Sequence, residues 1–194
     1  MAKTPSPDQE IGRDAKLVMR EKDAEAGDLL RWSRDFRAAA DRWDALFVLN
    51  DRPDVAIAAG ADGVHIGQND LPPSSARQIV GADVLIGLST HSRAEFDAGA
   101  PEADYLCVGP LAATPTKPGR PATGLEIVIH AASRAQEGTE RRPWFAIGGI
   151  DVESLAGVLG AGAARVAVVR AAAVRDPGDA VRALVAGLAD IPVS

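Results

Sequence analysis

Short apolar runs alternate with longer stretches along most of the chain, and each run has the length of a strand. Turn-forming and polar residues separate these runs from the stretches between them. We predict seven strands, at Lys16–Met19, Ala45–Leu49, Gly63–Ile66, Val84–Leu88, Tyr105–Val108, Trp144–Ile147 and Arg165–Val169.

The stretches between the strands have the features of helices. Residues 51–62 and 151–162 predict short helices that end at glycines. In the last helix Asp176 is the expected N-cap and Pro177 the first helical residue. The longest helix is predicted within residues 23–43, where the apolar residues at helical spacing are Leu29, Trp32, Phe36, Ala40 and Trp43.

This order of strands and helices, with mostly short connections, predicts an α/β fold in which helices cover a parallel sheet. A doubly wound open sheet and a closed barrel both fit the order. Unusual polar residues follow nearly every predicted strand. In a barrel every strand directs its carboxyl end to one shared mouth, whereas an open sheet gathers its functional groups at one switch point. The pattern therefore favours a TIM (β/α)8 barrel, formed by residues 16–194 as a single domain.

The strand count is one short of a complete barrel. Residues 1–15 are polar and contain proline, with Ile11 as their large apolar residue, so we expect an irregular N-terminal segment there. A barrel of seven strands would be incomplete. Such a barrel has two unpaired strand edges, which another copy of the chain could cover in a homo-oligomer.

Composition narrows the classes of partner. The 194 residues are 46% hydrophobic, enough for a packed core, and carry a formal net charge of -6. An acidic protein with a pI near 5.1 is not expected to bind nucleic acid or an anionic membrane broadly, although a few local cations suffice for a small anionic ligand. The single cysteine, Cys107, cannot form an internal disulfide, and no apolar stretch approaches the roughly 18 residues of a membrane span. We expect a soluble, cytoplasmic protein.

Two cations extend the first predicted strand. Side chains alternate along a strand, so Val18, Arg20 and Lys22 fall on one side of it. Two cations on one face are costly to bury unless an anion lies between them. A bound anion would meet this requirement, and so would a solvated edge in which they pair with Glu21 or Asp23.

Acids follow the next two strands. Asp51 comes after "LFVLN" and Asp70 after "GVHIGQN", and Asn50 supplies an amide beside them. Two carboxylates can bind a Mg²⁺ that keeps its other positions for water and phosphate. Equally, Asp51 could be an N-cap and Asp70 a turn former.

Two further segments have features of phosphate sites. "FAIGGI" ends a strand with Gly148 and Gly149, which lets backbone N–H groups approach an oxyanion, and "VAVVRAAA" follows the last strand. The loop "ATPTKPGRPATG", residues 113–124, places Lys117 among hydroxyls, prolines and glycines, as expected of a lid that closes over phosphates. Tight turns and an exposed connection are the plainer alternatives.

Three remaining residues are first read as structural. His65 lies within a strand, where a hydrogen-bonded histidine is favoured over a metal ligand, although it could touch a substrate ring. His91 follows Ser89 and Thr90, where loop capping and ligand contact are both open. Cys107 lies in an apolar run and is expected to be a core thiol.

Six motifs together resemble the thiamine phosphate synthase family over residues 16 to about 175. They are "REK", "LNDR", "GADGVHIGQNDLP", "IGLSTHS", "DYLCVGPLAATPTKPGRPATG" and "FAIGGID". The resemblance implies a (β/α)8 barrel that joins a hydroxymethylpyrimidine diphosphate to a thiazole phosphate, giving thiamine phosphate and inorganic diphosphate. In this family a first strand and helix precede "REK", and residues 1–15 stand in their place here. The barrel is therefore expected to lack or shorten its first βα unit, through start-site misassignment or genuine loss.

The resemblance also implies roles for residues at matching positions. Asp51 and Asp70 would bind Mg²⁺. The residues expected around the pyrimidine diphosphate are Arg20, Lys22, Asn50, Ser89 and Lys117, with Val18 where the family usually has a glutamine. The thiazole phosphate would be held by Thr114, Thr116, Gly149, Val169 and Arg170.

The chemistry implied by the resemblance is dissociative. Diphosphate leaves first, and the thiazole nitrogen then attacks the pyrimidine-methyl cation. Such a reaction needs cations and donors where the leaving-group charge develops, and it needs water kept away from the carbocation. The implied catalytic residues are Arg20, Lys22, Ser89 and Lys117.

Two other functions are weighed against the transferase. A thiazole-phosphate isomerase or regulator of the same superfamily would need the phosphate site alone, and Asp51, Asp70 and Lys117 argue against it. A non-catalytic, degenerate homologue would be consistent with the missing first βα unit.

Lys117→Ala tests the role of the loop. We expect turnover to fall by about 10²-fold or more, the scale for losing one preorganised group that stabilises developing charge. The measurement is steady-state formation of thiamine phosphate, and near-normal turnover would exclude the role.

Overall fold

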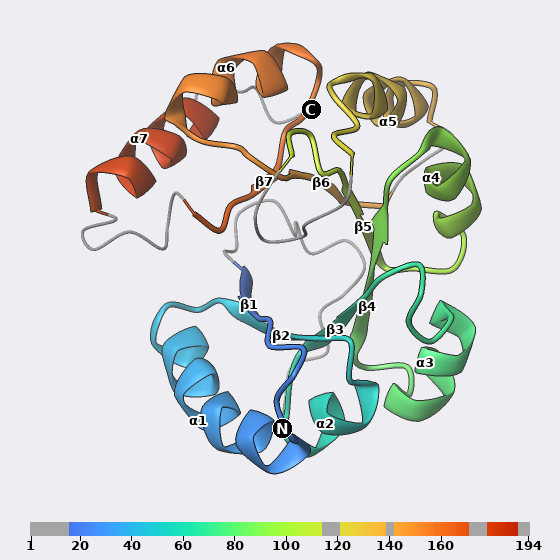
Figure 1. The fold of residues 1–194 in the computed structure, drawn as a ribbon, viewed down its shortest axis with the longest axis vertical. Coiled ribbons are helices and arrows are strands. Elements are labelled where there is room, and N and C mark those ends of the chain that lie inside the picture. The colour runs from blue at the N-terminus through green and yellow to red at the C-terminus, as the bar shows by residue number, and fades with distance from the viewer. Residues whose placement is uncertain (1–15, 114–120, 139–141, 171–177, 190–194) are drawn as a thin grey trace. The chain divides into compact units, whose positions relative to one another are not determined.

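The computed structural model describes residues 16–113, 121–138, 142–170 and 178–189. Strands and helices alternate throughout these residues (Figure 1). The chain forms two compact units. The first contains the chain through Ser89 together with Glu102–Tyr105, and the second contains Thr90–Pro101 and the chain from Leu106 onward.

The first unit is a parallel sheet with helices along one side of it (Figure 1). Neighbours in the chain pair in the order β1, β2, β3, β4, and α1 and α2 pack against β1–β3. Its elements are β1 (Lys16–Met19), α1 (Ala26–Arg42), β2 (Leu46–Asn50), α2 (Pro53–Ala58), β3 (Gly63–Ile66), α3 (Pro73–Val80) and most of β4 (Leu85–Thr90).

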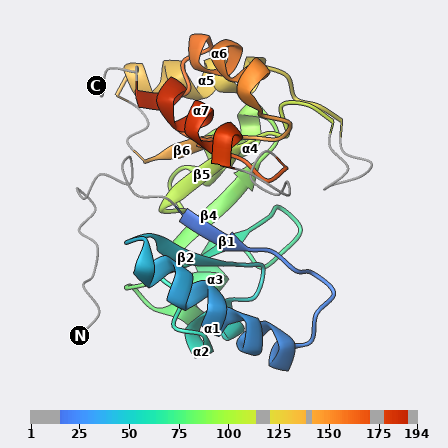
Figure 2. The same cartoon turned by 90° about the vertical axis from the view of Figure 1, so that its left-hand side faces the viewer.

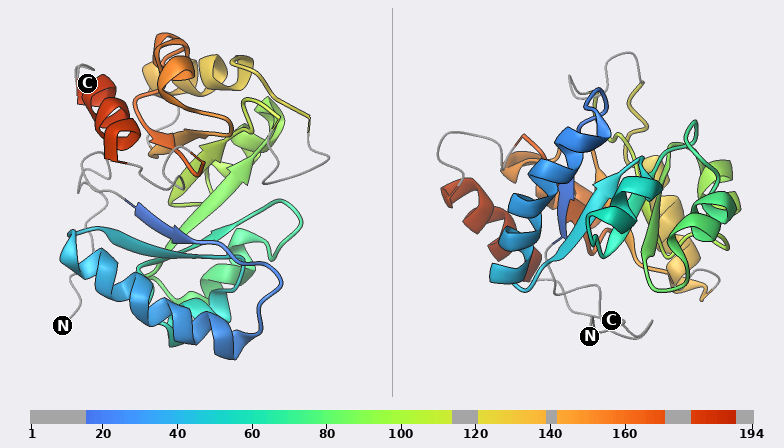
Figure 3. Two further views of the ribbon diagram at one scale, coloured as in Figure 1. Left: turned by 60° about the vertical axis from the view of Figure 1, so that its left-hand side comes forward. Right: turned by 90° about the horizontal axis from the view of Figure 1, so that it is seen from below.

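The second unit repeats this arrangement with the later elements. β5 pairs with β6 and β6 with β7, again in parallel. Helices α4 and α5 pack together, as do α6 and α7 (Figure 2; Figure 3). None of the described helices combines the length and the apolar character that a bilayer crossing would require. The elements are α4 (Arg93–Gly99), β5 (Tyr105–Val108), α5 (Glu126–Gln136), β6 (Trp144–Ile147), α6 (Val152–Gly160), β7 (Val166–Ala167) and α7 (Gly178–Ala189).

The parallel α/β class predicted from the sequence is confirmed. β1, β3, β5 and β6 have the predicted bounds, β2 and β4 begin one residue later than predicted and end later, and β7 is shorter. The shortened first βα unit stays a prediction because residues 1–15 lie outside the described residues. The N-cap predicted at Asp176 lies outside them too.

β2, β3, β4 and β5 supply most of the core, because they are apolar over consecutive positions and largely buried. The fully buried side chains of the first unit include Phe47, Val48, Val64 and Ile86, and those of the second include Leu106, Val108 and Val128.

The predicted apolar face of α1 is wrong in part. Leu29 and Ala40 are buried, but Trp32 is 37% exposed and Trp43 is 73% exposed. The buried stripe contains Ser33 instead, which is satisfied locally because its hydroxyl donates to the carbonyl of Leu29 at 2.7 Å.

An aspartate clamp appears twice in the first unit, at the amino ends of strands. Just before β3, Asp62 donates its N–H to the carbonyl of Phe47 and accepts the Phe47 N–H on its carboxylate, both at 2.8 Å. The same carboxylate oxygen accepts a hydrogen bond from Arg37 of α1 at 2.6 Å. The clamp therefore joins a strand, its neighbour and the helix between β1 and β2.

The second clamp is built in the same way forty-odd residues later. Just before β5, Asp104 exchanges the same pair of hydrogen bonds with Ile86, at 2.8 Å and 2.7 Å, and its carboxylate pairs with Arg77 of α3. In each clamp the partner is the second residue of its strand, and the arginine comes from the helix that precedes that strand.

Asp104→Ala tests the clamp. Ile86 is fully buried, so its N–H would lose its partner away from water, and we expect unfolding free energy to fall by about 2 kcal/mol. Urea denaturation followed by circular dichroism measures the change. Asp83→Ala, at an exposed aspartate on the segment before β4, is the matched control and should stay within about 0.5 kcal/mol of the wild type. Equal stability of the two variants would contradict the clamp.

Candidate functional site

Two carboxylates lie at the carboxyl ends of adjacent strands in the first unit. β2 and β3 pair so that Asn50 lies beside His65, and Asp51 continues the pairing by donating its N–H to the His65 carbonyl at 2.8 Å. Asp70 lies after the turn that follows β3, where its carboxylate accepts the Gly67 N–H at 2.8 Å. The predicted pair is therefore brought together by two neighbouring strand ends.

Asp51 has an unusual backbone. Its φ of 65° lies in the left-handed region, which aspartate and asparagine enter more readily than most side chains. Such conformations persist only where the surrounding structure compensates for their cost, and they are found most often at functional sites.

Lys22 is the cation of this site. Its Nζ lies 2.5 Å from Oδ2 of Asp51, and the Asp51 side chain is 18% exposed. The ion pair is thus formed with Asp51 rather than with the neighbouring acids Glu21 or Asp23, which the sequence left as alternatives. Arg20, which directly follows β1, is exposed, and Val18 within β1 is 44% exposed.

The charge of Asp51 is not fully compensated. Burial raises the pKa of Asp51 above its usual value, Lys22 opposes this shift, and the neighbouring Asp70 carboxylate adds to it. A divalent cation would relieve the repulsion between the two acids.

The two carboxylates suit Mg²⁺, which needs few protein ligands, better than they suit a cation whose ligands all come from the protein. Among the described residues no group of three or more His, Cys, Asp or Glu could hold a metal. Mg²⁺ is commonly bound by one or two carboxylates while water and phosphate complete its coordination, and Asp51 and Asp70 match that requirement.

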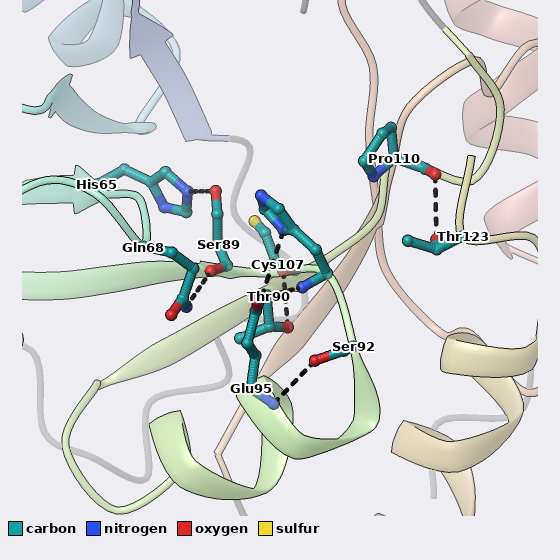
Figure 4. A network of polar contacts seen from close by, with 10 residues as sticks. His65, Gln68, Ser89, Thr90, Ser92, Glu95, Cys107, Pro110 and Thr123 are labelled. Carbon is teal, nitrogen blue, oxygen red and sulfur yellow. Dashed lines mark hydrogen bonds and ion pairs between the residues drawn. The ribbon is translucent and has the colours of Figure 1, made fainter. Parts of the chain in front are cut away.

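A hydrogen-bonded network lies next to the acids. His65 Nε2 is 2.8 Å from the hydroxyl of Ser89, and Gln68 donates to the Ser89 carbonyl at 2.7 Å (Figure 4). The other ring nitrogen of His65 is 3.2 Å from the hydroxyl of Tyr105. His65 is therefore the hydrogen-bonded histidine that the sequence predicted.

Sequence reasoning missed two members of this network. Tyr105 was read only as the first residue of an apolar strand, yet its ring stacks on His65 with 5.6 Å between centroids. Gly87 was not singled out, yet a Cβ there would overlap the Tyr105 ring and lie 2.5 Å from His65 Nδ1. A glycine inside an apolar strand was the signal that could have indicated a close approach.

The second unit holds a glycine turn after β6. Gly148 and Gly149 have φ values of 104° and 74°, which other residues rarely adopt. The Gly148 carbonyl accepts the Ala112 N–H at 3.1 Å, and a Cβ on Gly149 would lie 2.7 Å from the Ala112 side chain. Only glycines allow the turn to pack this closely on the segment after β5.

Val169 and Arg170 emerge beside this turn. β6 and β7 pair in parallel with Ile147 beside Ala167, so the residues that follow them leave the sheet at the same edge. Val169 is 52% exposed, and Arg170 is exposed as well. The pKa of Asp151 is lowered first by hydrogen bonds from Ser154, and the charge of Arg170 contributes a smaller part. The turn and Val169 therefore lie at the same edge of the sheet.

The predicted lid residues Thr114, Thr116 and Lys117 lie outside the described residues. The segments on either side of them are tied together, because both the N–H and the hydroxyl of Thr123 donate to the Pro110 carbonyl, at 2.8 and 3.0 Å (Figure 4). The loop therefore starts and ends at one point of the second unit.

His91 contributes to the cap of α4, one of its two predicted roles. Its N–H donates to the Glu95 carboxylate at 2.7 Å, and the Ser92 hydroxyl accepts the Glu95 N–H at 3.1 Å (Figure 4). Burial raises the pKa of Glu95. Cys107 is buried within β5, as predicted for a core thiol.

Comparison with known proteins gives one consistent result. A family model described as thiamine monophosphate synthase matches residues 12–172. The chain is 50% identical over 186 residues to a thiamine-phosphate synthase of Acidothermus cellulolyticus, covering 94% of this chain and 86% of the relative. It is 54% identical over 172 residues to the Mycobacterium leprae protein of the same name, covering 84% and 71%.

A solved structure agrees with these relatives. The thiamine phosphate pyrophosphorylase from Pyrococcus furiosus is 30% identical and superposes with a TM-score of 0.80, covering 90% of this chain and 83% of that one.

Asp51→Asn tests the acid pair without catalysis. Mg²⁺ should raise the thermal midpoint of the wild type, because a ligand that binds the folded state stabilises it, and should raise that of the variant much less. Differential scanning fluorimetry over a magnesium titration measures both. Asp54→Asn, at an exposed aspartate of α2 that pairs with Arg52, is the control and should respond like the wild type.

In metal-free buffer, the difference in stability between the wild type and Asp51→Asn should depend on pH. A carboxyl with a raised folded-state pKa favours the folded state below its ordinary pKa, and that contribution is lost as pH rises through the raised value. We therefore expect the stability of the wild type relative to Asp51→Asn to decline as pH rises through that range. An increase would contradict the assigned environment of Asp51.

Proposed function

Since the chain belongs to the thiamine monophosphate synthase family, we propose that it joins a hydroxymethylpyrimidine diphosphate to a thiazole phosphate, releasing thiamine phosphate and inorganic diphosphate. The observation that carries the proposal within the molecule is the cluster of Lys22, Asp51 and Asp70 beside the buried Ser89 hydroxyl. A cation, a metal-binding acid pair and a neutral donor are the groups that a leaving diphosphate requires.

The first unit is assigned to the pyrimidine diphosphate. Asp51 and Asp70 would hold Mg²⁺, which when bound supplies positive charge to the diphosphate oxygens. Lys22 pairs with Asp51, and Arg20 directly follows β1. Asn50 and Ser89 add neutral polar groups at the ends of β2 and β4.

These residues favour a dissociative reaction. The bond between the pyrimidine methylene carbon and the diphosphate oxygen breaks, and its electron pair leaves with the diphosphate. The lone pair of the thiazole nitrogen then forms the new bond to the methylene carbon. Groups placed where the leaving charge develops lower the barrier to the first step, and Lys22, Arg20, Ser89 and Lys117 are assigned to it.

The second unit is assigned to the thiazole phosphate. The turn at Gly149 and the backbone at Val169 and Arg170 are the proposed contacts, since a glycine turn lets backbone N–H groups approach a phosphate closely. Thr114 and Thr116 are assigned to the same phosphate from the resemblance, and the closing loop that carries them would exclude water.

Two finer points complete the proposal. The (β/α)8 barrel with a shortened first βα unit is retained, and the likeness to the Pyrococcus furiosus structure supports a related fold. The identity to synthases favours the transferase over an isomerase or regulator.

The decisive experiment is direct. Purified protein is mixed with both substrates and Mg²⁺, and thiamine phosphate and diphosphate are measured, with a chelator-treated sample alongside. We expect both products in equal amounts and their loss on chelation. Absence of thiamine phosphate would reject the transferase, and full activity after chelation would reject the Asp51 and Asp70 assignment.

Lys22→Ala should lower kcat by about 10²-fold, because it removes a cation from the leaving group and leaves the Asp51 carboxylate without the ammonium it pairs with. The matched control is Arg31→Ala, which removes an exposed cation paired with Asp28 on the surface of α1. Its kcat should stay at the wild-type value.

A further inference from the structure

A chain of three polar side chains crosses the first unit from β5 to the end of β4. The Tyr105 hydroxyl is 3.2 Å from His65 Nδ1, and His65 Nε2 is 2.8 Å from the Ser89 hydroxyl. Tyr105 is 2% exposed and Ser89 7% exposed. Both hydroxyls are therefore buried, while His65 between them is half-buried, and the direction of the two contacts decides which proton is available to a ligand.

Donor and acceptor roles along this chain are coupled. A neutral imidazole carries one N–H, so if Nε2 donates to Ser89, Nδ1 must accept from Tyr105. If the proton lies on Nδ1 instead, Nε2 accepts the Ser89 proton. A diphosphate oxygen can only accept hydrogen bonds, so Ser89 can serve it only when its own proton is free.

We propose that Tyr105 is a positioning residue that donates its O–H to His65 Nδ1, and that this direction holds His65 in the tautomer whose Nε2 donates to Ser89, so that the Ser89 proton is directed at the leaving diphosphate. This rests on the proposed function for the identity of the acceptor. Tyr105 acts through His65 and touches no reacting atom.

The surroundings of Tyr105 hold it in this role. Its ring stacks on His65, and the ammonium of Lys16, a residue of β1, lies 5.4 Å from the centroid of the Tyr105 ring. Gly87 provides the space, since a side chain there would overlap the Tyr105 ring. The serine is fixed in turn by the hydrogen bond from Gln68 to its carbonyl.

Tyr105→Phe keeps the ring and removes the donor. We expect kcat to fall about tenfold, the scale of one hydrogen bond, with the KM for the thiazole phosphate unchanged. In a Ser89→Ala background the same change should cost less than twofold, because a residue that acts through Ser89 has nothing left to direct. Ser33→Ala removes a buried hydroxyl in α1 and should leave kcat unchanged.

Nitrogen-15 NMR of the histidine rings provides a readout that does not depend on activity. The wild type should show His65 protonated on Nε2, and Tyr105→Phe should shift the ring toward a tautomer mixture. The His65→Asn spectrum assigns the signal among the three histidines.

The outcomes separate the two proposals. Wild-type kcat in Tyr105→Phe, an equal loss in both backgrounds, or His65 protonated on Nδ1 would each overturn the role of Tyr105. A wild type that shows the Nε2 tautomer but makes no thiamine phosphate would instead overturn the proposed function.

Discussion

The register between β2, β3 and β4 is the constraint on which the first unit depends. Parallel pairing places Asn50 beside His65 and His65 beside Gly87, so the three positions form one row across the sheet. Gly87 leaves room for the His65 and Tyr105 rings, and Ser89, two residues further along β4, lies within reach of the same histidine. Asp51 follows this row by one residue. A side chain at position 87 would therefore disturb His65 of β3 and Tyr105 of β5, and with them the contact of His65 with Ser89 of β4.

The pair Asp51 and Asp70 lowers the stability of this unit, and the same features would suit the proposed binding of a cation. Burial and the neighbouring Asp70 disfavour the charged form of Asp51, and its left-handed backbone adds a conformational cost. Lys22 offsets only part of this. An arrangement that disfavours its own charge in the absence of a ligand is suited to binding a cation, because the cation removes the repulsion that the fold otherwise tolerates.

Much of the fold could be predicted from the sequence, because a buried parallel strand leaves a short continuous apolar run between polar ends. The same logic found Asp51 and Asp70, since polar residues directly after such runs stand out. It failed at Trp43, where helical spacing continued past the last residue of α1 and the ring is exposed. It also missed Tyr105, which is an ordinary strand residue until its distant partner, His65, is placed beside it, and Gly87, whose position inside an apolar strand was the available signal. Pairings between residues that are twenty to forty positions apart are set by the register, and composition carries no trace of them.

The aspartate clamps at the opposite ends of the strands complete this dependence. Asp62 and Asp104 each fix one residue of a neighbouring strand through both its N–H and its carbonyl, which leaves that pairing a single register. A slip by one residue between β2 and β3 would turn every side chain of the slipped strand to the other face, and Asn50 would then no longer lie beside His65. The clamps lie just before β3 and β5, and by fixing the pairing of these strands they constrain which side chains can form the site. Their arginines extend the effect to α1 and α3, so the helices as well as the strands are tied to the geometry at the carboxyl ends.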